Sequence, residues 1–340
     1  MRRVLLPAAL AATLWLAWVH ETRFPLRGLD DAPLTLIVPP GASVESIARQ
    51  LTALGLVRHP LVFRAHLLSR GDGGRLRAGE YLVDGPASLD DIAEMLVRGD
   101  VVRHDVTFPE GKSLDDMAAL AAEHGLDAKA FLAAAREPRA IHDLDGAATD
   151  LEGYLFPDTY DVPKSGDPAG ESRRLVGRMV ERFRAVAVPE MSRLTSRGLS
   201  LREAVTLASI VELETAQPDE RPRIAAVFLN RLKLGMPLQT DPTVIYALRK
   251  AGTYDGNIRK KDLSVDSPYN TYKHGGLPPG PIASPGRDAL KAVAEPAEAH
   301  DLYFVSRNDG THEFNETLAL HEKAVDRYQR HRVSSRGEKG

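Results

Sequence analysis

Residues 204–216 read AVTLASIVELETA, and this apolar run decides how the middle of the chain folds. Ser200 and Glu203 precede it with the three-residue spacing of a capping box, while Pro218 follows it and stops a helix. The apolar residues recur at three- and four-residue intervals rather than alternately. The run therefore predicts a helix over about residues 200–216.

Two glutamates interrupt this apolar run. Glu212 shares one stripe of the helix with Val205 and Ala208, and Glu214 shares a second stripe with Leu207. Burial disfavours a charged carboxylate and raises its pKa, which keeps a proton available for donation to a leaving group. Either glutamate is therefore a candidate general acid, and the periodicity does not rank them. A glutamate with a purely structural role at a helix edge is the alternative.

The composition excludes several kinds of chemistry. The 340 residues include 44 lysines and arginines and 47 aspartates and glutamates, a formal net charge of -3 that gives no indication of a nucleic-acid partner. The absence of cysteine excludes disulfides, thiolate metal sites and a cysteine nucleophile. His321 and Glu322 begin like a zinc-protease helix, but Val325 stands where the second histidine is needed. We expect neither a metal ion nor a cofactor.

An uncharged segment lies near the N-terminus. Residues 4–19, VLLPAALAATLWLAWV, follow two arginines and would span roughly 24 Å as a helix. A cleaved signal peptide is the alternative, but the A-x-A pattern at Ala9 would leave too short an apolar region before it. We expect residues 1–20 to form a cytoplasmic start and a transmembrane anchor, with the bulk of the chain outside. Residues 21–33 would then be a tether.

A strand–turn–helix unit recurs along the chain. Residues 37–48 (IVPPGASVESIA) resemble residues 107–118 (TFPEGKSLDDMA) and, more loosely, residues 82–93 (LVDGPASLDDIA). Each copy has a turn with glycine, then a serine that suits a helix N-cap, then acidic residues in the first turn. Well-capped helices are the simplest interpretation. The pattern of residues 34–58 also resembles the start of a LysM module, a small fold that binds N-acetylglucosamine chains.

The rest of the chain alternates irregularly between helix and strand patterns, which favours an α+β fold. The predicted helices cover residues 120–135, 171–186, 200–216, 221–234, 242–251 and 286–295, with a Pro/Gly linker at 162–170. A strand at 301–306, a turn at Asn308-Asp309-Gly310 and a short strand to Phe314 predict a hairpin, followed by a terminal helix. Residues 331–340 form a polar tail that we expect to be disordered.

Unusual polar residues cluster in two loops, LQTDP and SPYNTY. Asp241 before Pro242 suits the N-cap and first position of a helix, so its presence has a structural explanation. Gln239 and Asn270 have no such explanation. Amide side chains beside tyrosines such as Tyr272 are typical of sugar subsites, because amides bond hydroxyl and N-acetyl groups while aromatic faces stack on sugar rings.

Four segments together resemble the YceG-like, or MltG-type, endolytic murein transglycosylases, over about residues 34–328. They are LASIVELETA, FLNRLKLGMPLQTDPTVIYAL, SPYNTYKHGGLPPGPIASPG and LYFVSRNDGTHEFNETLALH. The resemblance implies a lyase of the inner membrane that faces the periplasm. It implies a LysM-like subdomain (34–105) and a mixed α/β catalytic domain (106–330) that cuts nascent peptidoglycan strands, beside peptidoglycan synthases of the elongation or division machinery.

The resemblance also implies residue roles. The family's catalytic glutamate falls on Glu212, and Gln239, Asp241, Asn270 and Tyr272 would lie in the substrate groove. Glu212 would protonate the glycosidic oxygen between N-acetylmuramic acid and N-acetylglucosamine. It would then accept the proton of the muramic C6 hydroxyl, which closes on C1 as a 1,6-anhydro ring.

Two other functions remain open at this point. A hydrolytic muramidase would use a second carboxylate, such as Glu214, Asp241 or Glu152, to position water. A non-catalytic protein would bind glycan and act as a scaffold for peptidoglycan synthases. Analysis of the strand ends that the protein produces separates all three.

Overall fold

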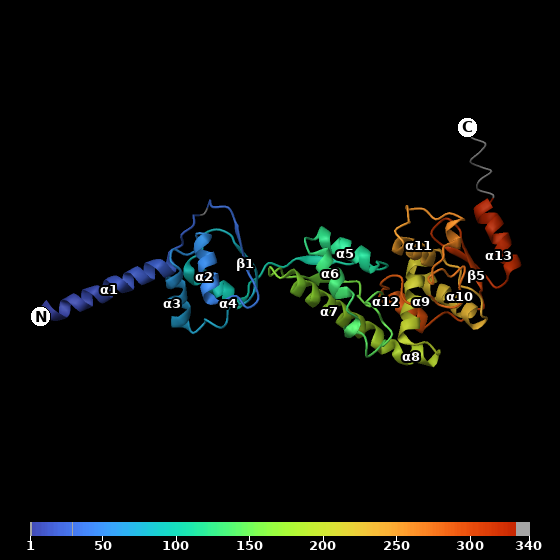
Figure 1. The fold of residues 1–340 in the computed structure, drawn as a ribbon, viewed down its shortest axis with the longest axis horizontal. Helices are drawn as coiled ribbons and strands as arrows, with labels where there is room; N and C mark the ends of the chain where they lie inside the picture. The colour runs from blue at the N-terminus through green and yellow to red at the C-terminus, as the bar shows by residue number, and fades with distance from the viewer. Residues whose placement is uncertain (1, 29, 331–340) are drawn as a thin grey trace, which may run out of the picture. The chain divides into compact units, whose positions relative to one another are not determined.

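The computed structural model describes residues 2–28 and 30–330, with side chains from residue 10 onward. Helices dominate, and the described strands pair as two-stranded sheets, β1–β2, β3–β4 and β5–β6 (Figure 1). This mixture confirms the predicted α+β class. The chain divides into a first unit, Met1–Val106 with Tyr160–Glu171, and a second unit, Thr107–Thr159 with Ser172–Gly340. The predicted disordered tail, 331–340, lies outside the described residues.

A small antiparallel sheet and three helices form the core of the first unit. Leu34 of β1 stands opposite Val83 of β2, and Val38 stands opposite Gly79. A Cβ at Gly79 would overlap the side chain of Val101, so glycine allows that close approach. The elements of this unit are α1 (Arg2–Arg23), β1 (Leu34–Val38), α2 (Val44–Ala53), α3 (Pro60–Arg70), β2 (Gly79–Val83) and α4 (Leu89–Arg98). Each of two short strands, β3 (Asp105–Thr107) and β4 (Thr159–Asp161), contains a point at which the chain passes from one unit to the other.

The repeated serines cap helices, as the sequence predicts. Ser43 accepts a hydrogen bond from the first turn of α2. Ser88 and Ser113 form complete capping boxes with Asp91 and Asp116, at the starts of α4 and α5 (Leu114–Glu123). Each cap satisfies backbone N–H groups that would otherwise lack a partner.

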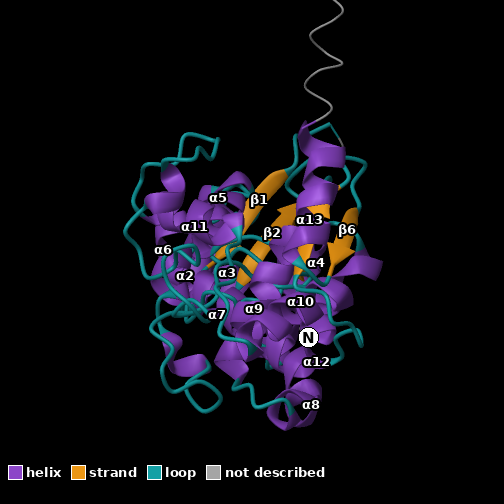
Figure 2. Cartoon of the chain, turned by 90° about the vertical axis from the view of Figure 1, so that its right-hand side faces the viewer, coloured by secondary structure: helices purple, strands orange, loops and turns teal. Residues whose placement is uncertain are grey.

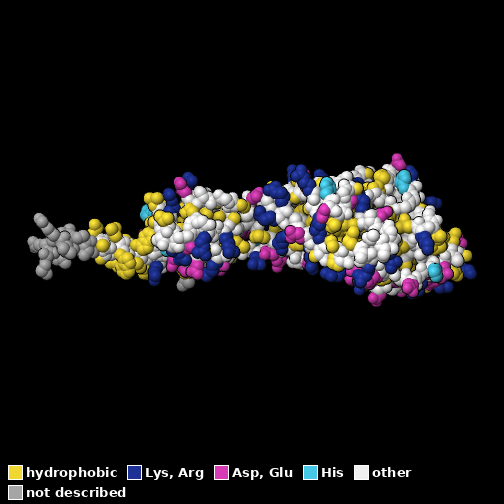
Figure 3. Space-filling view, turned by 90° about the horizontal axis from the view of Figure 1, so that it is seen from below, with side chains coloured by type: hydrophobic (Ala, Val, Ile, Leu, Met, Phe, Trp, Pro, Cys, Tyr) yellow, Lys and Arg dark blue, Asp and Glu magenta, His cyan; other side chains and the backbone are white. Residues whose placement is uncertain are grey.

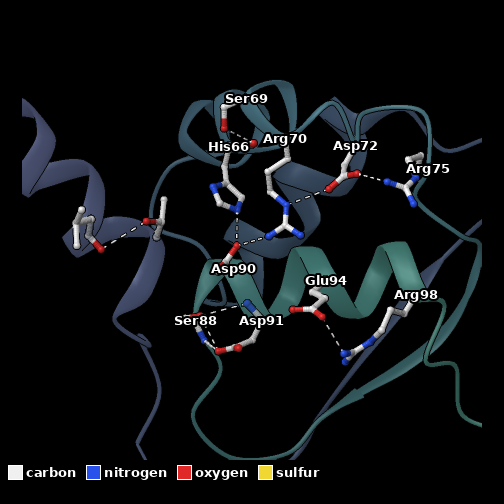
Figure 4. Close-up of polar contacts among 12 residues, drawn as sticks. His66, Ser69, Arg70, Asp72, Arg75, Ser88, Asp90, Asp91, Glu94 and Arg98 are labelled. Atoms are coloured by element: carbon white, nitrogen blue, oxygen red, sulfur yellow. Dashed lines mark hydrogen bonds and ion pairs between the residues drawn. The ribbon is translucent and has the colours of Figure 1, made fainter.

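A polar cluster joins α3 to α4 within the first unit (Figure 4). His66 Nε2 lies 3.0 Å from Asp90 Oδ1, and Arg70 bonds both Asp90 and the buried Asp72. Arg75 Nη1 donates to the second oxygen of Asp72 at 2.8 Å. Since Asp72 is only 3 % exposed, its two arginine partners supply the compensation that a buried carboxylate requires.

The helix α1 contains the predicted anchor, residues 4–19. In the part of the chain that the structure describes, no helix is both long and apolar enough to cross a membrane. The side chains of residues 2–9, on which the predicted span partly falls, lie outside the description. The later part of α1 contacts α3 and α4, where the ring of Trp18 lies 6.0 Å from the ring of His66.

The second unit is mainly helical. Its helix α9 packs against α10 and α12, which lie beside it in Figures 1 and 2. The elements here are α5 (Leu114–Glu123), α6 (Ala128–Ala135), α7 (Pro168–Ala187, entering from the first unit), α8 (Met191–Ser196), α9 (Leu201–Glu214), α10 (Arg221–Lys233), α11 (Asp241–Lys250), α12 (Arg287–Ala294), β5 (Tyr303–Ser306), β6 (His312–Asn315) and α13 (Leu318–Val325). Short turns of helix lie at Pro138–Ala140, Val188–Glu190, Pro218–Glu220, Asp262–Ser264 and Asp326–Arg330.

The structure corrects two predicted helices. The alanine-rich helix predicted over 120–135 is wrong, because Gly125 takes a left-handed φ of 73° and separates α5 from α6. The helix predicted over 200–216 ends two residues early, at Glu214, because Thr215 is extended and bonds the N–H of Gln217. The predicted hairpin is confirmed, with Ser306 opposite His312.

Helix α9 is apolar on nearly every side and forms the centre of the second unit. Residues from Ala204 to Val211 are all buried. Gly153, at a left-handed φ of 80°, packs so closely that a Cβ would lie 3.0 Å from Val205 Cγ1. Ser209 bonds the N–H of Ile282 at 3.1 Å, which fixes the 281–286 segment beside the C-terminal half of α9. This packing places the last turn of α9 against several loops.

Candidate functional site

Glu212 lies in the last turn of α9 and is held by two partners. Its side chain is 5 % exposed, and its Oε1 lies 2.6 Å from Arg221 Nη2. The backbone N–H of Gly286, just before α12, donates to Oε2 at 2.9 Å. A buried cation and a backbone donor both favour the carboxylate form of this group.

Burial works in the opposite direction on the same carboxyl. Loss of water contact is the largest influence and raises the pKa of Glu212 above its ordinary value. The negative charges of Glu110 and Asp288 raise it further, while the Gly286 N–H and Arg221 lower it. The net result is a raised pKa on a carboxyl whose charged form is paired with a cation.

Glu110 is a second carboxylate beside this group, on the turn that precedes α5. Its turn is anchored because the N–H of Gly111 donates to Ser284 O, and the N–H of Ser284 donates to Lys112 O, each at 2.9 Å. Gly111 takes a left-handed φ of 74°, and a Cβ there would lie 3.2 Å from Leu213 Cδ2. A Cβ at Gly286 would overlap the Glu110 carboxylate, so Glu110 rests directly on the Gly286 backbone.

Arg221 is the first residue of α10 and is 7 % exposed. A cation at a helix N-terminus is electrostatically unfavourable, because the unpaired N–H groups there carry partial positive charge. Three carboxylates compensate it: Nη2 lies 2.6 Å from Glu212 and 3.6 Å from Glu110, and Nη1 lies 3.8 Å from Asp288. The site is therefore one buried cation shared by three acids.

Glu214 belongs to a different environment, a pocket of about 500 Å³. The hydroxyl of Thr240 donates to its carboxylate. Burial raises the pKa of Glu214 to about 7, and the charge of Asp241 adds to that effect, while His312 and Arg231 oppose it. The pocket is lined by Glu214, Arg231, Leu238, Gln239, Asp241, Tyr272, Tyr303, Phe304, Val305, Ser306, His312, Leu318, His321, Val325 and Gln329.

Three of the residues predicted for a substrate groove meet in this pocket: Gln239, Asp241 and Tyr272. The hydroxyl of Tyr272 donates to Asp241 Oδ1 at 2.7 Å. Burial and that hydrogen bond raise the pKa of Tyr272, so the phenol stays a donor. Gln239 has a φ of 51°, a left-handed conformation that non-glycine residues seldom adopt and that is common at functional sites.

Asn270, the fourth predicted groove residue, does not reach the pocket. It is fully buried, and its amide nitrogen donates to the carbonyls of Leu263 and Val265 at 3.0 Å and 2.8 Å. Its amide oxygen accepts from the N–H of Tyr272 at 2.9 Å. These bonds make Asn270 the residue that shapes the SPYNTY loop and thereby positions Tyr272.

Glu152, the other candidate for a second carboxylate in hydrolysis, is buried and hydrogen-bonded to groups of the protein itself. It accepts hydrogen bonds from the Leu114 N–H at 3.1 Å and the Tyr246 hydroxyl at 3.2 Å. Burial raises the pKa of Glu152 to about 8. Glu152 therefore links the first residue of α5 to Tyr246 of α11.

The two histidines of the C-terminal segment contact neighbours of different kinds. His312 Nδ1 lies 2.7 Å from Glu220 Oε2, and the ring of His321 stacks on Tyr303 at 5.2 Å. Burial lowers the pKa of His321, which favours the neutral ring. Within residues 2–28 and 30–330, no group of three or more histidines and acids is arranged to hold a metal ion.

Sequence reasoning missed Glu110 and Arg221, although each has a signal. Glu110 stands in the repeat where the first copy has Pro40, so an acid precedes the turn glycine in the TFPEGKSLDDMA copy but not in IVPPGASVESIA. Arg221 follows a Pro-Asp-Glu helix start, where a cation opposes the helix dipole. A charge in an unfavourable place indicates compensating partners elsewhere in the chain.

Comparisons with known proteins agree with one another. The YceG-like family model matches residues 36–327. The chain is 34% identical over 331 residues to the endolytic murein transglycosylase of Bacillus subtilis (strain 168), covering 93% of this chain and 89% of that protein. It is 32% identical over 321 residues to the protein of that name from Streptococcus pneumoniae serotype 2, covering 85% of this chain but only 57% of the relative. A YceG-like protein from Listeria monocytogenes has a crystal structure that matches with a TM-score of 0.57 and 31% identity, over 87% of this chain and 100% of that one.

Proposed function

This chain belongs to the YceG-like family, as the resemblance in its sequence implies, and we propose from this premise that it is an endolytic murein transglycosylase. It cuts nascent peptidoglycan strands between N-acetylmuramic acid and N-acetylglucosamine. The relatives that carry this name match most of the chain, and the family model matches residues 36–327, a range that contains α9. The observation that carries the proposal is the carboxyl of Glu212, which is buried, has a raised pKa and still has a cation within 2.6 Å.

Glu212 serves as acid and then as base in this proposal. Its proton passes to the glycosidic oxygen while the bond from that oxygen to the muramic C1 breaks. The resulting carboxylate takes the proton of the muramic C6 hydroxyl as that oxygen bonds C1, which closes the 1,6-anhydro ring and restores the protonated acid. Arg221 and the Gly286 N–H stabilise the carboxylate that the first step leaves, and the raised pKa keeps the acid protonated beforehand and favours the return of a proton in the second step.

A hydrolytic muramidase is the second candidate, and one observation favours it. Glu110 lies beside Glu212, with both carboxylates close to the same arginine nitrogen. A pair of carboxylates flanking the scissile bond is the usual equipment of a glycoside hydrolase. The other acids considered for this role, Glu214, Asp241 and Glu152, each accept a hydrogen bond from a hydroxyl elsewhere in the second unit.

Product analysis decides between these two reactions. Uncrosslinked strands are digested with the purified full chain in heavy-oxygen water, and the ends are identified by mass spectrometry. We expect 1,6-anhydromuramic ends without label. Reducing muramic ends that contain the heavy isotope would establish hydrolysis instead, and no cleavage by the wild-type chain would leave only the glycan-binding scaffold.

We also propose that the pocket containing Gln239, Asp241 and Tyr272 binds part of the glycan strand. Its amide, carboxylate and phenol groups suit sugar hydroxyls, and the ring of Tyr303 supplies an aromatic wall. Replacement of Gln239 with Ala should raise KM with little change in kcat. An unchanged KM would remove Gln239 from the subsite.

The placement of the protein in the cell is a further proposal. We propose that residues 4–19 anchor it in the inner membrane with the remainder in the periplasm, near peptidoglycan synthases. Leu10, Leu14, Trp15 and Leu16 are between 60 % and 64 % exposed, and hydrophobic side chains gather along this helix in Figure 3. Retention in the membrane fraction after alkaline extraction supports the anchor, and release into the supernatant contradicts it.

A LysM-like role for residues 34–105 is supported by the order of their elements and by their apolar core. The strand–helix–helix–strand segment from β1 to β2 shares one apolar core with α4, as a small binding module requires. We propose that it binds N-acetylglucosamine chains. Retention of the full-length Glu212→Gln chain on insoluble peptidoglycan tests binding without cleavage.

A further inference from the structure

The Glu212 site presents a charge problem that the reaction must solve. A general acid has to carry its proton before the bond breaks, yet the carboxylate of Glu212 is the 2.6 Å partner of a buried arginine. Protonation of Glu212 therefore removes the principal counter-ion of Arg221. A buried cation left without a partner is strongly destabilising.

Glu110 is placed to take over as that counter-ion. Its Oε2 lies 3.6 Å from Nη2 of Arg221, the same nitrogen that pairs with Glu212. An adjustment of less than about 1 Å would bring this pair to hydrogen-bond distance. The turn of Glu110 is anchored to the Ser284 backbone, and the carboxylate rests on Gly286, so both limit how far it can move away.

Asp288 is a weaker candidate for the same task. It lies 3.8 Å from the other terminal nitrogen of Arg221, and its side chain is 60 % exposed against 45 % for Glu110. Water screens a more exposed charge more effectively. Glu110, Arg221, Asp288 and the Gly286 N–H are the groups that face Glu212 from the loops and helices around it.

We propose that Glu110 is a positioning residue that exchanges Arg221 with Glu212 during the reaction. Arg221 pairs with Glu110 while Glu212 holds its proton, and returns to Glu212 once the proton has passed to the leaving oxygen. When Glu212 takes the proton of the C6 hydroxyl, Arg221 moves back to Glu110. The proposal rests on the proposed function, since it presumes that Glu212 is the acid and the base.

The test compares Glu110→Gln with Asp288→Asn in the full chain. Loss of the Glu110 charge removes the alternative partner and makes protonation of Glu212 harder. The alkaline limb of the kcat profile should therefore move to lower pH by about one unit, with about tenfold lower kcat at pH 8 and an unchanged KM. Asp288→Asn should move the limb by less than half as much. Glu110→Asp, which keeps the charge on a shorter side chain, should recover part of the loss.

The outcomes separate this proposal from the proposed function. Production of anhydro ends by the wild-type chain is measured first, because their absence would overturn the function itself. If anhydro ends form, an unshifted limb in Glu110→Gln, or equal shifts in Glu110→Gln and Asp288→Asn, overturns the exchange. A complete loss of cleavage in Glu110→Gln with an intact unfolding transition also overturns it, because Glu110 would then take part in the chemistry directly.

Discussion

Glu212 and Glu214 stand two residues apart at the end of one helix and lie in different environments. Residues at this spacing do not face each other, so the last turn of α9 presents them to separate surroundings. Glu212 is paired with Arg221 and the Gly286 N–H, whereas Glu214 accepts a hydroxyl bond from Thr240 inside a pocket. Burial raises the pKa of both.

The difference lies in what happens after a proton is lost. The carboxylate of Glu212 is stabilised by a direct ion pair, while that of Glu214 has Arg231 and His312 only as more distant charges. Burial alone thus makes a proton donor. A residue that must also act as base needs a partner for its charged form, and Glu212 has one.

The strongest test of this comparison exchanges each glutamate for glutamine. Glu212→Gln removes the proton donor and should lower strand cleavage by about 10³-fold or more. Glu214→Gln is the matched control on the same helix turn and should lower it by less than tenfold. Release of anhydro ends from purified strands is the measurement, with thermal unfolding to confirm that both variants fold.

The reverse order of these two effects would transfer the acid role to Glu214. It would also show that the pocket of Gln239 and Tyr272 contains the reacting bond rather than a neighbouring part of the strand.

A backbone change should damage only the Glu212 side of the comparison. The φ of Gly286 is -79°, which alanine can adopt, but the added Cβ would overlap the Glu110 carboxylate. Gly286→Ala should displace Glu110 and disturb the N–H donor to Glu212, with about a tenfold to hundredfold loss of kcat. Gly275→Ala, where a Cβ meets nothing within 4 Å, is the control and should keep full activity. Equal activity of the two variants would show that the contact at Gly286 does not matter.

For Glu214, the other glutamate of the comparison, the raised pKa predicts that the stability of the fold depends on pH. Folding raises this pKa from 4.5 to about 7, so the folded chain binds the proton more tightly. The resulting stability is fully present below pH 4.5 and is lost as the pH rises through 7. The free energy of unfolding should fall by about 1–2 kcal/mol over this window, since pocket water reduces the full effect of about 1.4 kcal/mol per pKa unit. Glu214→Gln should flatten that slope in urea titrations, and an unchanged slope would contradict the assignment.

The sequence predicts the parts of this site that depend on local interactions. The capping box of α9, the caps at Ser88 and Ser113 and the 303–315 hairpin follow from short-range spacing and are confirmed. The sequence predicts the end of α9 two residues too late, because Thr215 is held by a turn that its own propensity does not reveal.

Long-range contacts explain what the sequence could not predict. Glu110 and Glu212 are about a hundred residues apart in the sequence. They come together because the turn of Glu110 is hydrogen-bonded to the Ser284 backbone, a contact that no sequence periodicity predicts. In the sequence the amide of Asn270 has no local hydrogen-bond partner, which is why it indicates a sugar ligand. Its partners, Leu263 and Val265, belong to a loop whose path depends on the fold.

The smallest expected effect concerns the pocket of Glu214. Tyr272→Phe removes the hydroxyl that bonds Asp241 at 2.7 Å, while the ring stays in place. A hydrogen bond contributes about 0.5–1.5 kcal/mol, so the loss of this contact to Asp241 should raise KM about twofold to tenfold while kcat changes by less than twofold. Tyr254→Phe is a suitable control, because Tyr254 does not line this pocket. If kcat fell instead while KM stayed constant, Tyr272 would act on the transition state, and the division between a chemical side at Glu212 and a binding side at Glu214 would have to be abandoned.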